Sequence, residues 1–343
     1  MNWPPFASLL LLDFAVVFLA VLLGTRVVLG LFRRRNILDH PNPRSSHSTP
    51  TPHGGGIAVI AVVLVNWGVF SFSSPSGPAE ILTLCGLAAA LAVLSGLDDF
   101  YSLPVVLRLA VQAAAVTVVL WPAGESVFFQ GLLPAPLDHI AAGLLWVWFI
   151  NLFNFMDGID GLAASESASI AIGFFLVVVL IGNRGISDVY LFYSSSIAAA
   201  VLGFLWWNWH PAKIFLGDVG SIPLGFLIGW LLLILAERGF WLPALILPLY
   251  YFSDATLTLV RRILRREKFW QAHRQHFYQL AVQRGMSHGA AVRAVIFANV
   301  LLIALAILSV YGWPNLSLGG AGIVVGILLL HLSLGRGKKA SSR

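Results

Sequence analysis

Long apolar stretches are the feature that most constrains this sequence. A helix needs about 20 mainly apolar residues to cross the hydrocarbon core of a bilayer, and eleven stretches of this kind follow one another along the chain. Only 10% of the residues are charged and 58% are hydrophobic, whereas a soluble domain carries about 25% charged residues. The chain therefore lacks the polar surface of a soluble globule, and lipid is its expected solvent.

The predicted fold is all-α, a polytopic membrane helical bundle with about 11 transmembrane helices. Residues 1–343 form one membrane domain, with a large loop at 260–290. Pro243 and Pro248 fall within the ninth stretch, so a kink or break is expected there. The predicted spans are 6–32, 54–73, 79–96, 104–121, 139–155, 163–182, 189–209, 222–236, 240–259, 293–312 and 318–334.

The distribution of Lys and Arg between the loops predicts the orientation of the bundle. With eleven spans, 19 of the 21 basic residues fall on the side of the 33–53 loop, and only Arg184 and Arg238 fall on the other. Cytoplasmic loops carry an excess of Lys and Arg, so this side is predicted to face the cytoplasm. The same bias explains the net charge of +6 without nucleic acid as a partner.

Five loops on the predicted cytoplasmic side hold most of the unusual polar residues. The first ends in His53, Gly54 and Gly55 at a helix start, where backbone N–H groups suit a phosphate; close helix packing is the alternative explanation for the glycines. The second carries adjacent carboxylates, Asp98 and Asp99, at the end of a span. Such a pair requires a cation or a proton, which favours a divalent metal site or a catalytic base over a simple helix cap.

The third and fourth loops add further acids and amides. Polar residues recur at three-residue steps, a spacing that keeps side chains near one face of a helix; they are Asn151, Asn154, Asp157 and Asp160. Groups of this kind are costly in an apolar stretch unless they meet a ligand, an ion or water. Asp218 lies between glycines just before another span, which suits a metal ligand, with a helix N-cap as the alternative.

The fifth loop, at 260–290, contains His273, Arg274 and His276. Two histidines three residues apart share a helical face and suit phosphate binding, proton transfer or metal ligation. A run of arginines precedes them and suits anionic lipid headgroups or a diphosphate. A basic helix that lies at the membrane surface is the alternative explanation for these arginines.

Taken in order, these motifs resemble the polyprenyl-phosphate N-acetylhexosamine-1-phosphate transferases. The resemblance covers residues 39–280 and rests on HSTPTPHGGG, GLDD, NFMDGIDGL, FLGDVGS and HRQH. It implies a Mg²⁺ cofactor, with Mn²⁺ as a substitute, a UDP-N-acetylhexosamine donor and undecaprenyl phosphate as acceptor. By motif, the resemblance implies catalytic roles for Asp98, Asp99, Asp157 and Asp160, and metal binding by Asp218 and Asp98. The substrate-binding residues are expected to be Asn151, Asn154, His273, Arg274, His276, Arg108, His53, Gly54 and Gly55.

Within this family, the HRQHFYQ sequence resembles the enzymes that start O-antigen synthesis. Within that subgroup, the pattern resembles enzymes that handle UDP-N-acetylated 6-deoxyhexosamines such as N-acetylfucosamine, and UDP-N-acetylglucosamine stays open as the donor. A peptidoglycan translocase that forms lipid I is the alternative within the family. A secondary transporter is the alternative from another class, although the acids fall at helix ends and no repeat is evident. A homodimer, and a covalent aspartyl-phosphate intermediate, also stay open.

Overall fold

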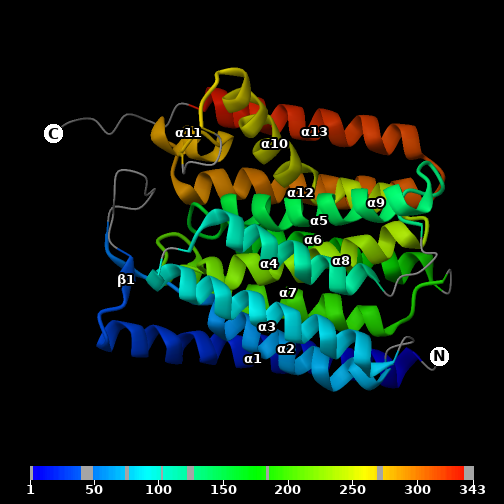
Figure 1. Ribbon diagram of the computed structural model, residues 1–343, viewed down its shortest axis with the longest axis horizontal. Helices are drawn as coiled ribbons and strands as arrows, with labels where there is room; N and C mark the ends of the chain where they lie inside the picture. Colours follow the sequence, from blue (N-terminus) through cyan, green and yellow to red (C-terminus); the bar gives the residue numbers. More distant parts are fainter. Residues whose placement is uncertain are drawn as a thin grey trace.

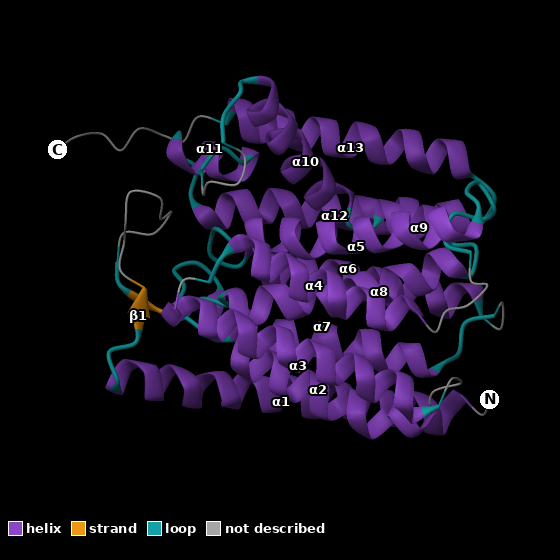
Figure 2. Cartoon of the chain, in the orientation of Figure 1, coloured by secondary structure: helices purple, strands orange, loops and turns teal. Residues whose placement is uncertain are grey.

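The computed structural model describes residues 3–39, 49–73, 77–101, 103–121, 127–182, 185–268 and 273–335. Most of the described residues are helical, and they include one short antiparallel pair of strands (Figure 2). The first half comprises α1 (Trp3–Arg34), β1 (Leu38–Asp39), β2 (Thr51–Pro52), α2 (Gly56–Phe70), a 3₁₀ turn (Ser71–Ser73), α3 (Pro78–Tyr101), α4 (Val105–Leu120) and α5 (Ala135–Phe155). The second half comprises α6 (Leu162–Ile181), α7 (Val189–Asn208), α8 (Asp218–Glu237), α9 (Trp241–Ile246), α10 (Leu249–Leu264), α11 (Phe277–Gln283), α12 (His288–Val310) and α13 (Pro314–Leu334).

The predicted polytopic bundle is confirmed. Among the described residues, nine helices are long and apolar enough to cross a membrane, and the shorter apolar helix α4 lies at the predicted fourth span. The predicted break in the ninth span is also confirmed, because α9 ends at Ile246 and α10 begins at Leu249. Pro248 stands directly before α10, and its missing N–H interrupts the helical hydrogen bonds.

The long helices run side by side, and the start of α1 and the end of α13 lie at opposite ends of the bundle (Figure 1). The end that carries β1 and α11 is called the site end below. It also contains the ends of α3, α5 and α7 and the starts of α6, α8 and α12. Several basic residues used to predict the orientation lie outside the described residues, namely Arg44, Arg184, Arg336, Lys338, Lys339 and Arg343.

Burial follows the expectation for a protein dissolved in lipid. The central helices α6, α7 and α8 bury large aromatic side chains, including Phe174, Phe204 and Phe226. The outer helices expose apolar side chains instead, as Val27 of α1 and Val106 of α4 show with 70% and 77% exposure. Exposed apolar surface on this scale is favourable in a bilayer and unfavourable in water.

Close contact between α2 and α8 fixes the loops at the site end. A Cβ atom on Gly56 would collide with the Cα atom of Gly220, so the two helix starts approach as only glycines allow. The backbone N–H groups of Gly54 and Gly55 donate to the carbonyl of Phe215, over 3.2 and 2.8 Å. The segment after β2 is thereby held against the segment that precedes α8.

Candidate active site

Asp218 is the first residue of α8 and lies at the centre of an acidic group at the site end. Its Oδ1 accepts a 2.7 Å hydrogen bond from Nδ2 of Asn154, which also donates to Ser221 over 2.9 Å. Gly217, the residue before it, has a φ of 78°, and a Cβ atom there would lie 2.8 Å from Nε2 of His53. Three of the predicted site residues, from three separate segments, therefore meet around the start of α8.

Asp157 lies beside this group, in the loop that follows α5. It accepts a hydrogen bond from the backbone of Gly217 and interacts electrostatically with Asp218. Burial and the negative charge of Asp218 together raise the pKa of the Asp157 carboxyl well above its ordinary value. Two acids in this relation favour either a shared proton or a nearby cation.

Asp99 approaches the same centre from the end of α3. It interacts electrostatically with His53, Asp218, Asp98 and Asp39. Its Oδ2 lies 3.7 Å from Nε2 of His53, and its side chain is 36% exposed, which leaves it accessible to a ligand. Asp39 was not among the predicted site residues. Its position before the proline-rich loop was the available signal.

Asp98 differs from its neighbour because both of its oxygens have local partners. Oδ2 forms a 2.6 Å ion pair with Arg108, and Oδ1 accepts a 2.6 Å hydrogen bond from the backbone N–H of Leu103. The Arg108 side chain is thus held at the end of α3, with its buried Nε lacking a hydrogen-bond partner among the described residues. These contacts suit a positioning role for Asp98.

The donor chemistry of Asp99, Asp157 and Asp218 fits Mg²⁺, which prefers carboxylate oxygens and keeps several water ligands. Among the described residues, these acids are not grouped closely enough to surround an ion by themselves. Substrate phosphate oxygens and water would therefore complete the coordination of an ion held here, as is usual for Mg²⁺ sites that bind phosphates.

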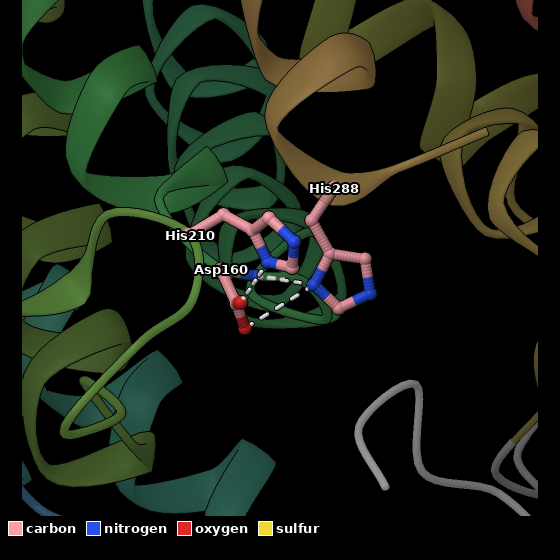
Figure 3. Close-up of side chains that lie close together, drawn as sticks. All are labelled: Asp160, His210 and His288. Carbon is pink, nitrogen blue, oxygen red and sulfur yellow. Dashed lines mark hydrogen bonds and ion pairs between the residues drawn. The ribbon is translucent and has the colours of Figure 1, made fainter.

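Asp160 belongs to a second cluster, with two histidines that were not among the predicted site residues (Figure 3). Its Oδ2 lies 2.6 Å from Nδ1 of His210, and its Oδ1 lies 3.2 Å from Nδ1 of His288. Burial raises the pKa of Asp160, but hydrogen bonds from both histidines outweigh this effect and lower it to about 2. The sequence did not indicate that His210 and His288 lie together, because they are 78 residues apart in the chain.

The fifth loop is anchored by an acid that the sequence reasoning also missed. Asp254 of α10 is completely buried and accepts hydrogen bonds from Nδ1 of His276, over 3.1 Å, and from the backbone N–H of Phe277, over 3.0 Å. His276 therefore joins α11 to α10. His273 stacks on His276 at 4.9 Å, and burial lowers the pKa of His273 to about 4. The signal for Asp254 was an acid within the apolar stretch 240–259.

The fifth loop also contacts the third. The hydroxyl of Tyr278 donates to the carbonyl of Phe155 over 3.0 Å, at the last residue of α5. A Cβ atom on Gly158 would collide with the same hydroxyl. Helix α11 thus holds the segment that carries Asp157.

The other predicted site residues form their hydrogen bonds with residues outside the acidic group. Asn151 donates to Gln112 of α4 over 2.6 Å and to the carbonyl of Val147, which joins α4 to α5. Gly54 and Gly55 use their N–H groups within the protein, which favours the close-packing explanation. The backbone carbonyl of Arg274 accepts a hydrogen bond from Gln283. Residues 269–272 of the same loop lie outside the described residues.

Comparison with known proteins adds independent information. The profile of glycosyl transferase family 4 matches residues 81–236. The chain is 29% identical to a probable undecaprenyl-phosphate N-acetylglucosaminyl 1-phosphate transferase of Bacillus subtilis, over 82% of this chain and 80% of the relative. It is 31% identical to a decaprenyl-phosphate N-acetylglucosaminephosphotransferase of Mycobacterium leprae, over 78% and 76%. It is 29% identical to a phospho-N-acetylmuramoyl-pentapeptide-transferase of Mycolicibacterium gilvum, over 87% and 94%.

Proposed function

Because the chain belongs to glycosyl transferase family 4, among the polyprenyl-phosphate N-acetylhexosamine-1-phosphate transferases, we propose that it transfers an N-acetylhexosamine 1-phosphate from a UDP-sugar to undecaprenyl phosphate and releases UMP. The observation that carries this proposal is the meeting of Asp99, Asp157 and Asp218 at one end of a membrane bundle. A polar donor reaches such a site from water, and a lipid acceptor reaches it from the bilayer.

The proposed reaction is a displacement at phosphorus. An oxygen of the lipid phosphate attacks the phosphorus next to the sugar, the bond from that phosphorus to the bridging oxygen breaks, and UMP leaves with the electron pair. Asp99 orients the attacking phosphate and takes its proton if it carries one. Asp218 and Asp157 would hold Mg²⁺, which supplies charge neutralisation for the diphosphate. Positioning and electrostatic stabilisation provide most of the rate in phosphoryl transfer.

A covalent route is the second mechanistic candidate, with a carboxylate as nucleophile. Asp99 is the acid whose exposure favours this role, since Asp98 is occupied by Arg108 and Leu103. An experiment that mixes the UDP-sugar with the enzyme, in the absence of lipid phosphate, distinguishes the covalent route from direct attack. A burst of UMP equal to the enzyme concentration supports the covalent intermediate, and its absence supports direct attack.

The sugar is proposed to be an N-acetylhexosamine. The similar proteins from Bacillus subtilis and Mycobacterium leprae carry N-acetylglucosamine in their names, which favours UDP-N-acetylglucosamine. The HRQHFYQ sequence of the fifth loop favours a 6-deoxy sugar such as N-acetylfucosamine. We place the reaction at the cytoplasmic face of a bacterial inner membrane, as the first step of O-antigen or another surface polysaccharide.

One assay tests both activity and sugar choice. Purified protein, undecaprenyl phosphate and Mg²⁺ are mixed with each of several UDP-sugars, with the sugar radiolabelled. We expect equal amounts of UMP and of organic-extractable label with at least one UDP-N-acetylhexosamine, and neither product after addition of EDTA. Sugar uptake into vesicles without release of UMP would instead support a transporter and would contradict the proposed function.

A further inference from the structure

The cluster of Asp160, His210 and His288 is not used by the proposed transfer reaction. Its three residues come from the loop after α5, the segment after α7 and the first turn of α12, and they converge on one point (Figure 3). One donor atom from each residue lies within 4.8 Å of the other two. We propose that these three side chains form a second metal site, which binds a divalent first-row transition metal ion of the Zn²⁺ class.

The donor types select this class of ion. Two imidazole nitrogens and one carboxylate are a ligand set found for Zn²⁺ and other first-row transition metals. Mg²⁺ prefers oxygen ligands throughout. The acidic group around Asp218 contributes carboxylates and suits Mg²⁺, so the two sites differ in the ion that they favour.

The observed distances are close to those that a bound ion requires. Ligands at about 2.0–2.2 Å from a tetrahedral ion lie roughly 3.4 Å from one another. Oδ1 of Asp160 and Nδ1 of His288 are already 3.2 Å apart. Oδ2 of Asp160 and Nδ1 of His210 are 2.6 Å apart, so these two atoms must move apart by less than about 1 Å to bind the same ion. The His210 side chain is 39% exposed and has room to move.

The surroundings hold the carboxylate in place and give an ion a way in. The backbone N–H of Ala212 donates to Oδ2 of Asp160 over 3.2 Å, and the N–H of Gly161 donates to Asn208 over 2.9 Å. Such partners outside the ligand set orient the ligands and sustain metal affinity. Asp160 and His288 are only 8% and 10% exposed, so the exposed edge of His210 is the route from solvent.

Cobalt binding tests the proposal directly, because Co²⁺ occupies Zn²⁺ sites and its visible absorption spectrum reports binding. The full chain is purified with a tag that contains no histidine, treated with a chelator, and titrated with Co²⁺ in the presence of millimolar Mg²⁺. We expect one Co²⁺ per chain, displaced by Zn²⁺ and not by Mg²⁺, and a higher melting temperature in the bound form. His210→Gln should weaken binding at least tenfold, since a direct ligand is lost.

Two further variants complete the test. His331→Gln changes an exposed histidine at the end of α13, outside the cluster, and should leave Co²⁺ binding unchanged. His288→Gln should weaken Co²⁺ binding at least as much as His210→Gln. The proposal would be overturned if the wild type and His210→Gln bound Co²⁺ with equal affinity, or if Mg²⁺ displaced the bound Co²⁺. No sugar transfer is measured, so failure of the proposed function and failure of the metal site are seen separately.

Discussion

Asp160 carries its charge in a largely buried place because two imidazoles and a backbone N–H surround it. Its pKa falls to about 2 in the folded protein, from an ordinary value of 3.8. A carboxyl group with a depressed pKa stabilises the folded state above its unfolded pKa, and this contribution is lost as the pH falls through the folded pKa. Asp160 therefore contributes its full share at pH 5 and above.

Asp160→Asn should lower the free energy of unfolding by about 2 kcal/mol at pH 6. The difference from the wild type should shrink to about half near pH 3 and nearly vanish at pH 2. Thermal unfolding in detergent, with a chelator present, measures this difference in the free energy of unfolding. Asp188→Asn, at the opposite end of the bundle, is the matched control. A difference that stays constant from pH 6 to pH 2 would show that the charge of Asp160 does not act as described.

Single residues also show where sequence reasoning stops. The motifs named Asp99, Asp157 and Asp218 as site residues, and in the structure Asp218 interacts electrostatically with both of the other two. They did not distinguish Asp98 from Asp99, because the difference arises from the ion pair with Arg108, ten residues further along the chain. The same limit applies to Asp254, whose hydrogen bonds depend on how α10 packs against α11.

At the scale of elements, α11 holds the third loop in place. Its Tyr278 hydroxyl contacts the carbonyl of Phe155 and closely approaches Gly158. The position of Asp157 therefore depends on a seven-residue helix that is itself fixed by Asp254. Small displacements of a catalytic group reduce phosphoryl transfer strongly, because positioning supplies much of its rate.

Gly158→Ala should accordingly reduce transfer by at least about 10-fold, since the added methyl group pushes α11 and the loop apart. Tyr278→Phe removes the hydroxyl that the methyl group meets, so the double variant should recover part of the lost rate. The control is Gly86→Ala in α3, where a Cβ atom meets no other atom within 4 Å. If Gly158→Ala and the double variant lose the same activity, the contact with Tyr278 is not the cause.

The sequence predicted the long helices better than it predicted single side-chain contacts. Apolar length predicted the helices, and Pro248 predicted the break between α9 and α10. The short helix α11 and the pairing of β1 with β2 were not foreseen. Both are too short to leave a periodic pattern and exist through contacts with distant segments, such as the hydrogen bonds between the segment after β2 and Phe215.

At the scale of the whole molecule, the acidic group of Asp99, Asp157 and Asp218 lies at the site end, and α1 begins at the opposite end of the bundle (Figure 1). The excess of basic residues predicts that the site end faces the cytoplasm. Cys85, the only cysteine, is buried and provides a parent protein without reactive thiols. Gln283 at the site end and Asn315 at the opposite end are both exposed.

Gln283→Cys and Asn315→Cys therefore test the orientation. In intact bacterial cells, a membrane-impermeant maleimide should label Asn315→Cys and leave Gln283→Cys unlabelled. The pattern should reverse in inverted membrane vesicles, and the parent with Cys85 alone should stay unlabelled in both. Labelling of Gln283→Cys in intact cells would place the acids on the outer face of the membrane.

The acidic centre itself is tested most directly by the transfer rate of Asp218→Asn. The amide keeps an acceptor for the Asn154 hydrogen bond and removes the charge at the centre of the group. We predict a fall in kcat of at least about 100-fold, the scale expected when electrostatic stabilisation of a transition state is lost, with full activity in Asp188→Asn. An Asp218→Asn protein that transfers sugar phosphate as fast as the wild type would contradict the proposed centre.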